Sequence, residues 1–203
     1  MIKYFETQLQ TIGNALHSMN DAAFSKLIEQ SCNTIQTNHK IIVSGLGKNV
    51  PICEKFVGSM VSLGMNACFM HTNSAVHGDL GVVKDGDLVI LLTKSGKTTE
   101  SVYLTEFLKL RHVNLWLLTF SRNSILTENI PNCIIMDLEH EGDPWNVMPN
   151  NSTTINLIVL QGLVMKLAER LHIDISVLKS NHPGGNIGKM LMKEDASCKK
   201  KQI

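Results

Sequence analysis

The sequence has no apolar run long enough to cross a membrane and almost no net charge. Its 203 residues carry 19 Lys and Arg against 18 Asp and Glu, a formal net charge of +1, which excludes a general electrostatic attraction to nucleic acid. A membrane-spanning helix needs about 20 consecutive apolar residues, and the longest runs here are far shorter. The first residues lack the charged, apolar and small-residue succession of a signal peptide. We therefore expect a cytoplasmic protein that binds neither membranes nor nucleic acid.

Paired cysteines are absent as well. The sequence has 5 Cys, an odd number, and no two of them have CxxC spacing, so neither a disulfide framework nor a zinc knuckle is indicated. Four of them lie in apolar or helical surroundings, where we expect small buried side chains. The full set is Cys32, Cys53, Cys68, Cys133 and Cys198. The expectation is a reduced, single-domain protein with a substantial core.

The first 38 residues are predicted to form two helices that pack on the domain or on a partner subunit. Leu9, Ile12 and Leu16 recur at three- and four-residue spacing, which places them on one helix face. Asn20 and Asp21 can cap a second helix. No chemistry is visible in these helices. The rest of the chain divides into a domain over residues 39–192 and a polar tail over residues 193–203.

Short apolar runs alternate with helical segments through the domain. Strands are expected at residues 40–44, 67–70, 87–92, 113–119 and 132–136, with helices between them and a long helix that ends near residue 171. Strands that alternate with helices indicate a parallel sheet with helices on both faces, joined by right-handed crossovers. The expected fold class is α/β, a three-layer αβα sandwich around a five-stranded parallel sheet.

The stretch over residues 88–100 combines a buried strand with a polar turn. Its unbroken apolar start suits a strand that is covered on both faces. The turn Thr93-Lys-Ser-Gly96 follows, and a helix starts near Thr98. A hydroxyl-rich turn at a helix start offers free backbone N–H groups to an anion such as phosphate. Ser and Thr also cap helices routinely, and the stretch alone slightly favours that structural interpretation.

Two other polar turns follow strands. The turn Gly45-Leu-Gly-Lys48 lacks the third glycine of a dinucleotide fingerprint and the spacing of a P-loop. A lysine there nevertheless lies at the edge where open α/β sheets bind ligands. The next loop carries His71, His77 and Asp79, a weak set of metal ligands, so a hydrogen-bonded loop histidine is favoured over a metal site.

An acidic loop over residues 137–144 follows the fifth strand and precedes a hydroxyl-rich helix start at residues 152–154. Clustered carboxylates are usually a solvated surface. Carboxylates and a helix start that meet at the carboxyl edge of a parallel sheet are, however, typical of an active site.

Together these turns resemble the sugar isomerase (SIS) domain family, and within it bacterial arabinose-5-phosphate isomerases of the Kdo pathway. The matching elements run in family order over roughly residues 40–190. They are Gly-Leu-Gly-Lys at 45–48, Ala-Val-His-Gly-Asp-Leu-Gly at 75–81, Ser-Gly-Lys-Thr-Thr-Glu at 95–100, Ser-Thr-Thr at 152–154 and His-Pro-Gly-Gly at 182–185. The resemblance implies a five-stranded parallel sheet between helices. It also implies interconversion of D-ribulose 5-phosphate and D-arabinose 5-phosphate, which feeds Kdo, lipopolysaccharide or capsule synthesis.

The resemblance further implies roles for individual residues. The catalytic positions would be Lys48, Glu100, Glu141 and His182. The substrate and its phosphate would contact Ser44, Gly45, His77, Ser95, Gly96, Lys97, Thr98, Ser152 and Thr153. No cofactor and no metal are implied. Relatives are commonly homotetramers in which a histidine reaches a neighbour's site, a part that His182 or His77 would take. A nucleotide sugar made further along the pathway is a candidate end-product inhibitor.

Aldose–ketose isomerisation through an enediolate needs a base near the carbon, an acid near the oxygens and a cation for the developing negative charge. Either Glu141 or His182 would move the carbon-bound proton. Lys48 would stabilise the enediolate or bridge to the phosphate, and Glu100 would orient Lys48 or shuttle the hydroxyl proton. A general base works best with a pKa near the working pH. Burial or the neighbouring Asp143 is expected to raise the pKa of Glu141 toward that range.

Departures from the family pattern leave the substrate open. Lys94 and Lys97 stand beside the Ser-Gly turn where the family has Asn and Glu, and the loops at residues 49–51 and 142–144 also differ. The alternatives are an isomerase of another sugar phosphate, such as a hexulose 6-phosphate, and a non-catalytic sugar-phosphate sensor. The lack of a helix-turn-helix or basic reading face, together with four competent catalytic positions, favours an enzyme. The tandem CBS domains that often follow in relatives are missing, so a short form is expected.

Overall fold

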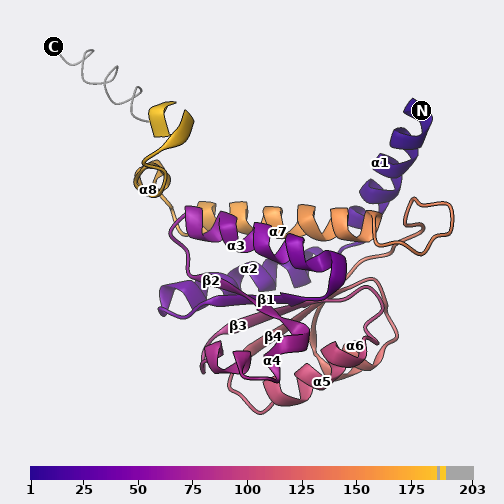
Figure 1. The fold of residues 1–203 in the computed structure, drawn as a ribbon, viewed down its shortest axis with the longest axis horizontal. Coiled ribbons are helices and arrows are strands. Elements are labelled where there is room, and N and C mark those ends of the chain that lie inside the picture. Colours follow the sequence, from indigo (N-terminus) through magenta and orange to yellow (C-terminus); the bar gives the residue numbers. More distant parts are fainter. Residues whose placement is uncertain (187, 191–203) are drawn as a thin grey trace.

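The structure is a computed structural model that describes residues 1–186 and 188–190. Its centre is one fully parallel sheet in the order β2-β1-β3-β4-β5 (Figure 1). The strands are β1 (Ile41–Gly45), β2 (Ala67–His71), β3 (Leu88–Leu92), β4 (Asn114–Thr119) and β5 (Asn132–Ile135). Each strand bound lies within one residue of its predicted position, and the expected fold class is confirmed.

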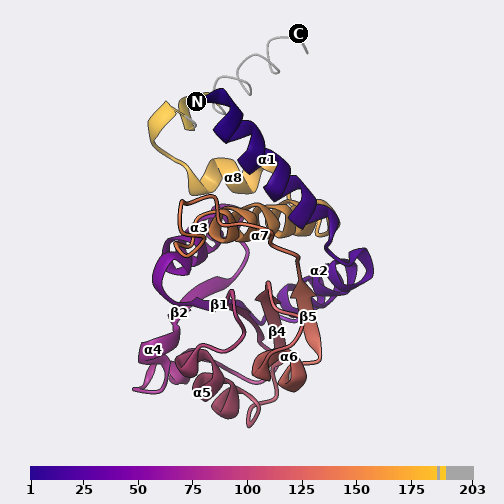
Figure 2. The same ribbon diagram turned by 90° about the vertical axis from the view of Figure 1, so that its right-hand side faces the viewer.

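Helices cover both faces of the sheet, as Figures 1 and 2 show. One layer holds α2 (Asp21–Gln36), α3 (Val50–Ser62) and α7 (Asn151–Arg170), and the other holds α4 (Thr72–Ala75), α5 (Thr99–Leu108) and α6 (Ile125–Asn129). Alternate residues of β3 enter the two cores, with Ile90 on the α7 side and Leu91 on the α5 side. Burial on both faces explains why this strand is apolar at every position.

The strand order places a crevice at the carboxyl ends of β1 and β3. These strands are neighbours, and Gly45 at the end of β1 pairs with Leu92 at the end of β3. The chain leaves β1 toward α3 and β3 toward α5, which cover opposite faces. Ligands of doubly wound folds bind where two neighbouring connections diverge in this way.

The two predicted N-terminal helices are present, and they differ in their packing. The side chain of Asn20 accepts the Ala23 N–H at 2.8 Å and so caps α2, which packs on the sheet through Leu27. α1 (Ile2–His17) contacts α7 and extends away from the sheet (Figure 2). Its outer part leaves Ile2 and Phe5 exposed.

Short helical turns are the elements that the sequence did not predict. The expected loop at residues 71–81 contains α4, whose start is capped because the Asn73 N–H donates to His71 Nδ1 at 3.3 Å. The same loop contains the start of the short 3-10 helix η2 (Asp79–Val82). A further short helix, α8 (Ile175–Asn181), follows α7. Elements of one or two turns carry too few residues to show an apolar period.

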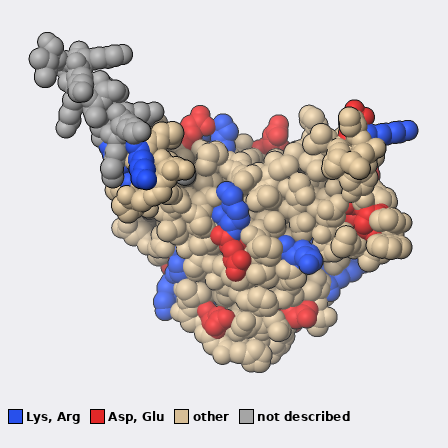
Figure 3. Space-filling view, turned by 45° about the horizontal axis from the view of Figure 1, so that its top comes forward, with Lys and Arg blue, Asp and Glu red and all other residues tan. Residues whose placement is uncertain are grey.

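Cysteine burial also differs from the expectation. Cys53 is buried in the core, whereas Cys32, Cys68 and Cys133 are half-buried. Cys198 and the predicted tail at residues 193–203 lie outside the described residues. In the part of the chain that is described, no helix has both the length and the apolar character to span a bilayer. On the face that Figure 3 shows, basic and acidic side chains are interspersed rather than gathered by sign.

Candidate active site

The turn between β3 and α5 presents the open start of a helix. Thr98 occupies the N-cap position of α5, yet its side chain accepts no N–H group of the helix. Its hydroxyl lies 3.2 Å from the Thr93 hydroxyl instead, while the Lys97 N–H donates to Ser95 Oγ at 3.2 Å. Without a side-chain cap, the first N–H groups of α5 and the positive end of its dipole remain available to an anion.

This turn is held in place by the neighbouring strand β4 and helix α6. The Lys94 carbonyl accepts the Phe120 N–H and the Thr119 hydroxyl, both at 3.1 Å. Gly96 has φ +62°, and a Cβ atom there would overlap the side chain of Ser124. Glycine is therefore required at this position both for its backbone conformation and for its missing side chain.

The turn after β1 is packed just as closely. A Cβ atom at Gly45 would lie 2.9 Å from the Cβ of Asn49. Asn156 Nδ2 of α7 donates to Asn49 Oδ1 at 3.1 Å, which ties the short 3-10 helix η1 (Gly47–Asn49) to α7. Lys48 in this turn is exposed, and it makes no ion pair with any described residue. Ser44 is buried, with its hydroxyl 2.9 Å from that of Thr72.

Glu141 is a fully buried carboxylate at the start of α7. Its Oε2 accepts the Asn150 N–H at 3.0 Å and the Ser152 N–H at 2.9 Å. Its Oε1 lies 2.8 Å from Lys94 Nζ in an ion pair, and receives no well-directed hydrogen bond from the described residues. Glu141 thus caps α7 from the preceding loop and reaches across the end of β4 to the turn after β3.

The expectation that the pKa of Glu141 is raised is wrong. Burial by itself raises this pKa, but the Lys94 ammonium and the backbone N–H groups of Ser152 and Asn150 outweigh burial and hold it below its ordinary value. Asp143 does not act on Glu141 as expected either, because its carboxylate accepts the N–H groups of Trp145, Val147 and Met148 within its own loop. Glu141 is therefore ionised throughout the neutral range.

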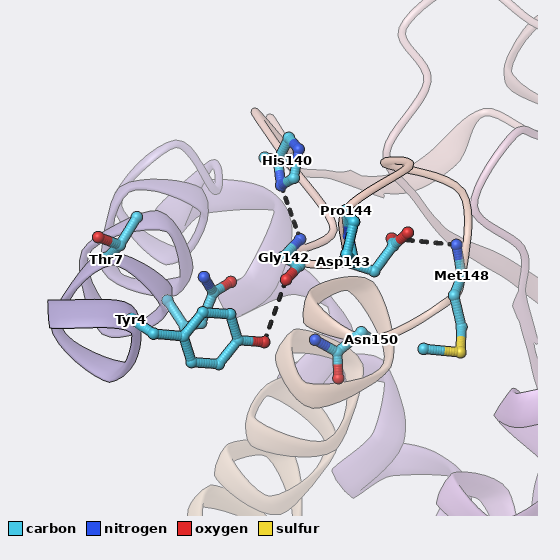
Figure 4. A pocket seen from close by; sticks show the side chains of 9 residues that line it. Tyr4, Thr7, His140, Gly142, Asp143, Pro144, Met148 and Asn150 are labelled. Atoms are coloured by element: carbon cyan, nitrogen blue, oxygen red, sulfur yellow. Dashed lines mark hydrogen bonds between the residues drawn. The ribbon is translucent and has the colours of Figure 1, made fainter. Parts of the chain in front are cut away.

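Helix α1 supports the loop that carries Glu141, as Figure 4 shows. The Tyr4 hydroxyl donates to the Gly142 carbonyl at 3.0 Å. Asn151 Nδ2 donates to Gln8 Oε1 at 2.7 Å and to the His140 carbonyl at 2.9 Å. A pocket of about 720 Å³ lies between α1 and this loop. The residues on both sides of Glu141 are thus held by side chains of α1 and α7.

A second cavity, of about 420 Å³, opens between the turn after β3 and the loop after β5. It is lined by Lys94, Ser95, Lys97, Phe120, Ser121 and Leu138. Two lysines and two serines therefore line one concave space next to the open start of α5. Such a lining suits a small anionic ligand.

The predicted site residues fall into two groups. Lys48, the 95–98 turn, Glu141 and Ser152 meet at the carboxyl edge of the sheet, and Glu100 lies exposed in the first turn of α5. Two of the predicted phosphate contacts have other partners, because the Ser152 N–H is used by Glu141 and the Thr153 hydroxyl donates to the Asn150 carbonyl at 2.9 Å.

His182 lies at the far end of α3. Asn181 Nδ2 donates to the Ser62 carbonyl at 3.2 Å, where α3 ends, while Lys48 stands just before α3 begins. A helix of 13 residues is about 20 Å long, so His182 is separated from Lys48 by about that distance within one chain. His77 lies exposed just after α4, beyond the end of the edge strand β2.

No metal centre is visible among the described residues, where no three His, Cys, Asp or Glu side chains gather to hold an ion. Of the residues in the suspected loop, His71 accepts a backbone N–H, and this hydrogen bond gives it a structural role.

The family model of the SIS domain matches residues 34–166 of this chain. The chain belongs to the SIS domain family. An uncharacterised protein of Chlamydia trachomatis is 35% identical over 184 residues, which cover 91% of this chain and 55% of that protein. Arabinose 5-phosphate isomerase KdsD of Francisella tularensis is 26% identical over 191 residues, which cover 94% of this chain and 58% of KdsD. The chain thus spans little more than half the length of these curated relatives.

Among solved structures, this SIS domain is similar to the Escherichia coli CFT073 protein c3406 in complex with arabinose 5-phosphate. The TM-score is 0.81 and the identity 30%, with 90% of this chain and 95% of that chain covered. The resemblance inferred from the sequence motifs is therefore confirmed. What those motifs did not reveal is the contact between Lys94 and Glu141. Lys94 is visible in the sequence as a departure from the family pattern, but its partner lies 47 positions further along the chain.

Proposed function

We propose that this SIS domain is a sugar-phosphate isomerase that interconverts D-ribulose 5-phosphate and D-arabinose 5-phosphate through an enediolate. The observation that carries the proposal is the uncapped start of α5 in a glycine-braced turn, next to a buried, ionised carboxylate. An anion site beside a fixed base is what a phosphorylated substrate and a proton transfer need. The names of relatives such as KdsD, and the arabinose 5-phosphate bound to the similar Escherichia coli structure, support this choice of sugar.

In this proposal the phosphate lies on Ser95, Gly96, Lys97 and Thr98. The N–H groups at the start of α5 and the Ser95 and Thr98 hydroxyls donate to its oxygens, and Lys97 neutralises part of its charge. Gly45 lets the backbone after β1 approach them closely, with Lys48 at the mouth of the crevice. Ser44, Ser152 and Thr153 act behind this first layer, because each already has a partner in the protein.

Proton transfer is assigned to Glu141 and His182, with Lys48 stabilising the enediolate and Glu100 orienting Lys48 or moving the hydroxyl proton. His182 Nδ1 lies 2.7 Å from the Leu178 carbonyl, so Nδ1 carries the proton and Nε2 is free to accept one. About 20 Å separates His182 from Lys48 in one chain. His182 therefore serves the site of a second copy, in a homotetramer with shared active sites, and His77 is the alternative donor across that boundary.

The wider setting follows from the proposed product. D-Arabinose 5-phosphate would feed Kdo, lipopolysaccharide or capsule synthesis, and a nucleotide sugar from that route would inhibit by competing at the same site. A cytoplasmic location and a reaction without cofactor remain predictions.

The decisive experiment incubates the protein with D-arabinose 5-phosphate in D₂O and follows ketose formation and deuterium incorporation at C1 of the ketose by NMR. Turnover is expected for the wild type and a loss of at least about 100-fold for Glu141→Gln and for His182→Gln, the usual contribution of a general base. His112→Gln, which changes an exposed histidine away from the crevice, is the matched control. Binding without turnover, both of D-arabinose 5-phosphate and of a hexulose 6-phosphate, would refute the isomerase and favour a sensor.

Mixing the two inactive variants tests the shared site. If His182 acts in a neighbour's site, mixed assemblies of Glu141→Gln and His182→Gln contain some sites with both native residues, and activity returns on mixing. No recovery after subunit exchange would contradict the assignment of His182. The same assay run with a hexulose 6-phosphate decides between the two isomerase alternatives.

A further inference from the structure

Lys94 separates the buried Glu141 from the cavity beside the phosphate turn. Glu141 is 0% exposed, whereas the Lys94 side chain is 41% exposed and lines the 420 Å³ cavity with Ser95 and Lys97. The Lys94 backbone is fixed because its carbonyl accepts two hydrogen bonds from the end of β4 and the residue after it. A ligand in the cavity therefore meets the ammonium of Lys94 before the carboxylate behind it.

The groups around Glu141 come from three parts of the chain. The turn after β3 contributes Lys94, and the start of α7 contributes the Asn150 and Ser152 N–H groups. Its own loop contributes Asp143, whose carboxylate is taken up by backbone N–H groups, and His140, whose Nδ1 accepts the Gly142 N–H at 2.8 Å. Lys94 is the one full positive charge paired with Glu141 among the described residues.

A buried carboxylate needs such a partner, since an ionised group taken out of water without compensation is strongly destabilising. The two N–H groups of α7 fix Oε2, and the ion pair alone fixes Oε1. Oε1 has no well-directed hydrogen bond among the described residues, so it still has a lone pair to accept a proton. It is also the oxygen that pairs with Lys94, a residue that lines the cavity.

We propose that Lys94 is a positioning residue that keeps Glu141 charged and aims its Oε1 toward the substrate cavity. Its catalytic meaning rests on the proposed function, in which Glu141 contacts the substrate. Lys94 is distinct from Lys97 in this respect. Lys97 lines the same cavity from the same turn but makes no ion pair with a described residue. Lys97 acts on the phosphate, and Lys94 acts on the carboxylate.

The test compares Lys94→Met, Lys94→Arg and the matched control Lys97→Met. The titration of the Glu141 side-chain carboxyl is followed by ¹³C NMR, with Glu141→Gln used to assign the signal. In Lys94→Met the titration is expected to move to higher pH by about one to three pH units, the range that loss of an adjacent opposite charge produces. Lys94→Arg should restore the wild-type titration, and Lys97→Met should leave it unchanged. An unchanged titration in Lys94→Met, or an equal shift in Lys97→Met, overturns the proposal.

Turnover of D-arabinose 5-phosphate across pH 5 to 8 gives the second readout. In Lys94→Met, kcat should fall more steeply between pH 8 and pH 5 than in the wild type, because a larger fraction of Glu141 is then protonated at pH 5. If the titration shifts but the pH profile of kcat does not, the catalytic part of the proposal is wrong. If the wild type isomerises no sugar phosphate, the proposed function fails, and the carboxyl titration still decides the role of Lys94.

If Lys94→Met does not fold, the double variant Lys94→Met/Glu141→Gln tests whether Lys94 and Glu141 act as a pair. It removes the buried charge together with its partner, so recovery of folding supports the pairing, and failure to recover contradicts it.

Discussion

Replacement of Gly96 by Ala should destabilise the protein more than replacement of Gly47 by Ala. Both glycines have positive φ, +62° and +56°, so both variants lose about 1–2 kcal/mol from the left-handed backbone of an L-residue. A gain of about 0.4–1 kcal/mol from the stiffer unfolded chain offsets part of this in both. Nothing lies within 4 Å of a Cβ built on Gly47, whereas one on Gly96 overlaps Ser124.

The difference between the two variants therefore isolates the contact with Ser124. Ser124 is the N-cap of α6, where its Oγ accepts the Thr127 N–H at 3.2 Å and its own N–H donates to Thr127 Oγ1 at 2.9 Å. Displacing this capping box costs about 1 kcal/mol. We expect Gly96→Ala to lower the free energy of unfolding by about 2 kcal/mol and Gly47→Ala by about 1 kcal/mol.

Urea unfolding followed by circular dichroism, at one fixed protein concentration, measures both losses. Repeating Gly96→Ala in a Ser124→Gly background removes the obstructing atoms, and the excess loss should then disappear. Equal losses for Gly47→Ala and Gly96→Ala, or an excess that survives Ser124→Gly, would refute the reasoning.

Three further predictions concern the core, the pH dependence and a buried thiol. Leu163→Ala, in the core of α7, should lower the free energy of unfolding by about 3–5 kcal/mol, against less than about 0.5 kcal/mol for the exposed Met165→Ala, both measured in urea. Burial raises the pKa of Asp143, but three backbone N–H groups outweigh it and hold this pKa below its ordinary value. The stability from Asp143 is thus full above the unfolded pKa of about 4 and is lost as pH falls through the folded pKa. The difference in unfolding free energy between wild type and Asp143→Asn should narrow below about pH 4, and a constant difference would contradict this. Burial strongly raises the pKa of Cys53, so iodoacetamide at pH 8 should modify it only after unfolding, as peptide mass spectrometry would show.

The layered fold was predictable from the sequence because the relevant signals are local. Each strand is an apolar run bounded by polar turns, and the strands alternate with helices of ordinary length. The strand order could not be read in the same way, since it depends on which crossover packs on which face. α4, η2 and α8 were missed because one or two turns carry no usable period.

The glycine and hydroxyl turns of the candidate site could be located in the sequence, whereas the contacts between them could not. Glycine turns and hydroxyls after strands mark the carboxyl edge wherever the fold is α/β. The predicted direction of the pKa shift at Glu141 was wrong. The shift depends on Lys94 and on the first N–H groups of α7, which only the folded chain brings together. The remoteness of His182 likewise follows from the length of α3 rather than from any motif.

The external capping of α7 by Glu141 has a consequence for how this scaffold can change. Glu141 Oε2 accepts the N–H groups of Asn150 and Ser152. The two ends of the segment over residues 142–149 are therefore held together by these hydrogen bonds. For a loop closed in this way, doubling the number of residues costs only about 0.6 kcal/mol. The segment can therefore be lengthened, shortened or exchanged as a cassette while the start of α7 stays anchored. Trp145 in this segment is 75% exposed, so the surface that the segment presents can change while the framework that holds Glu141 stays the same.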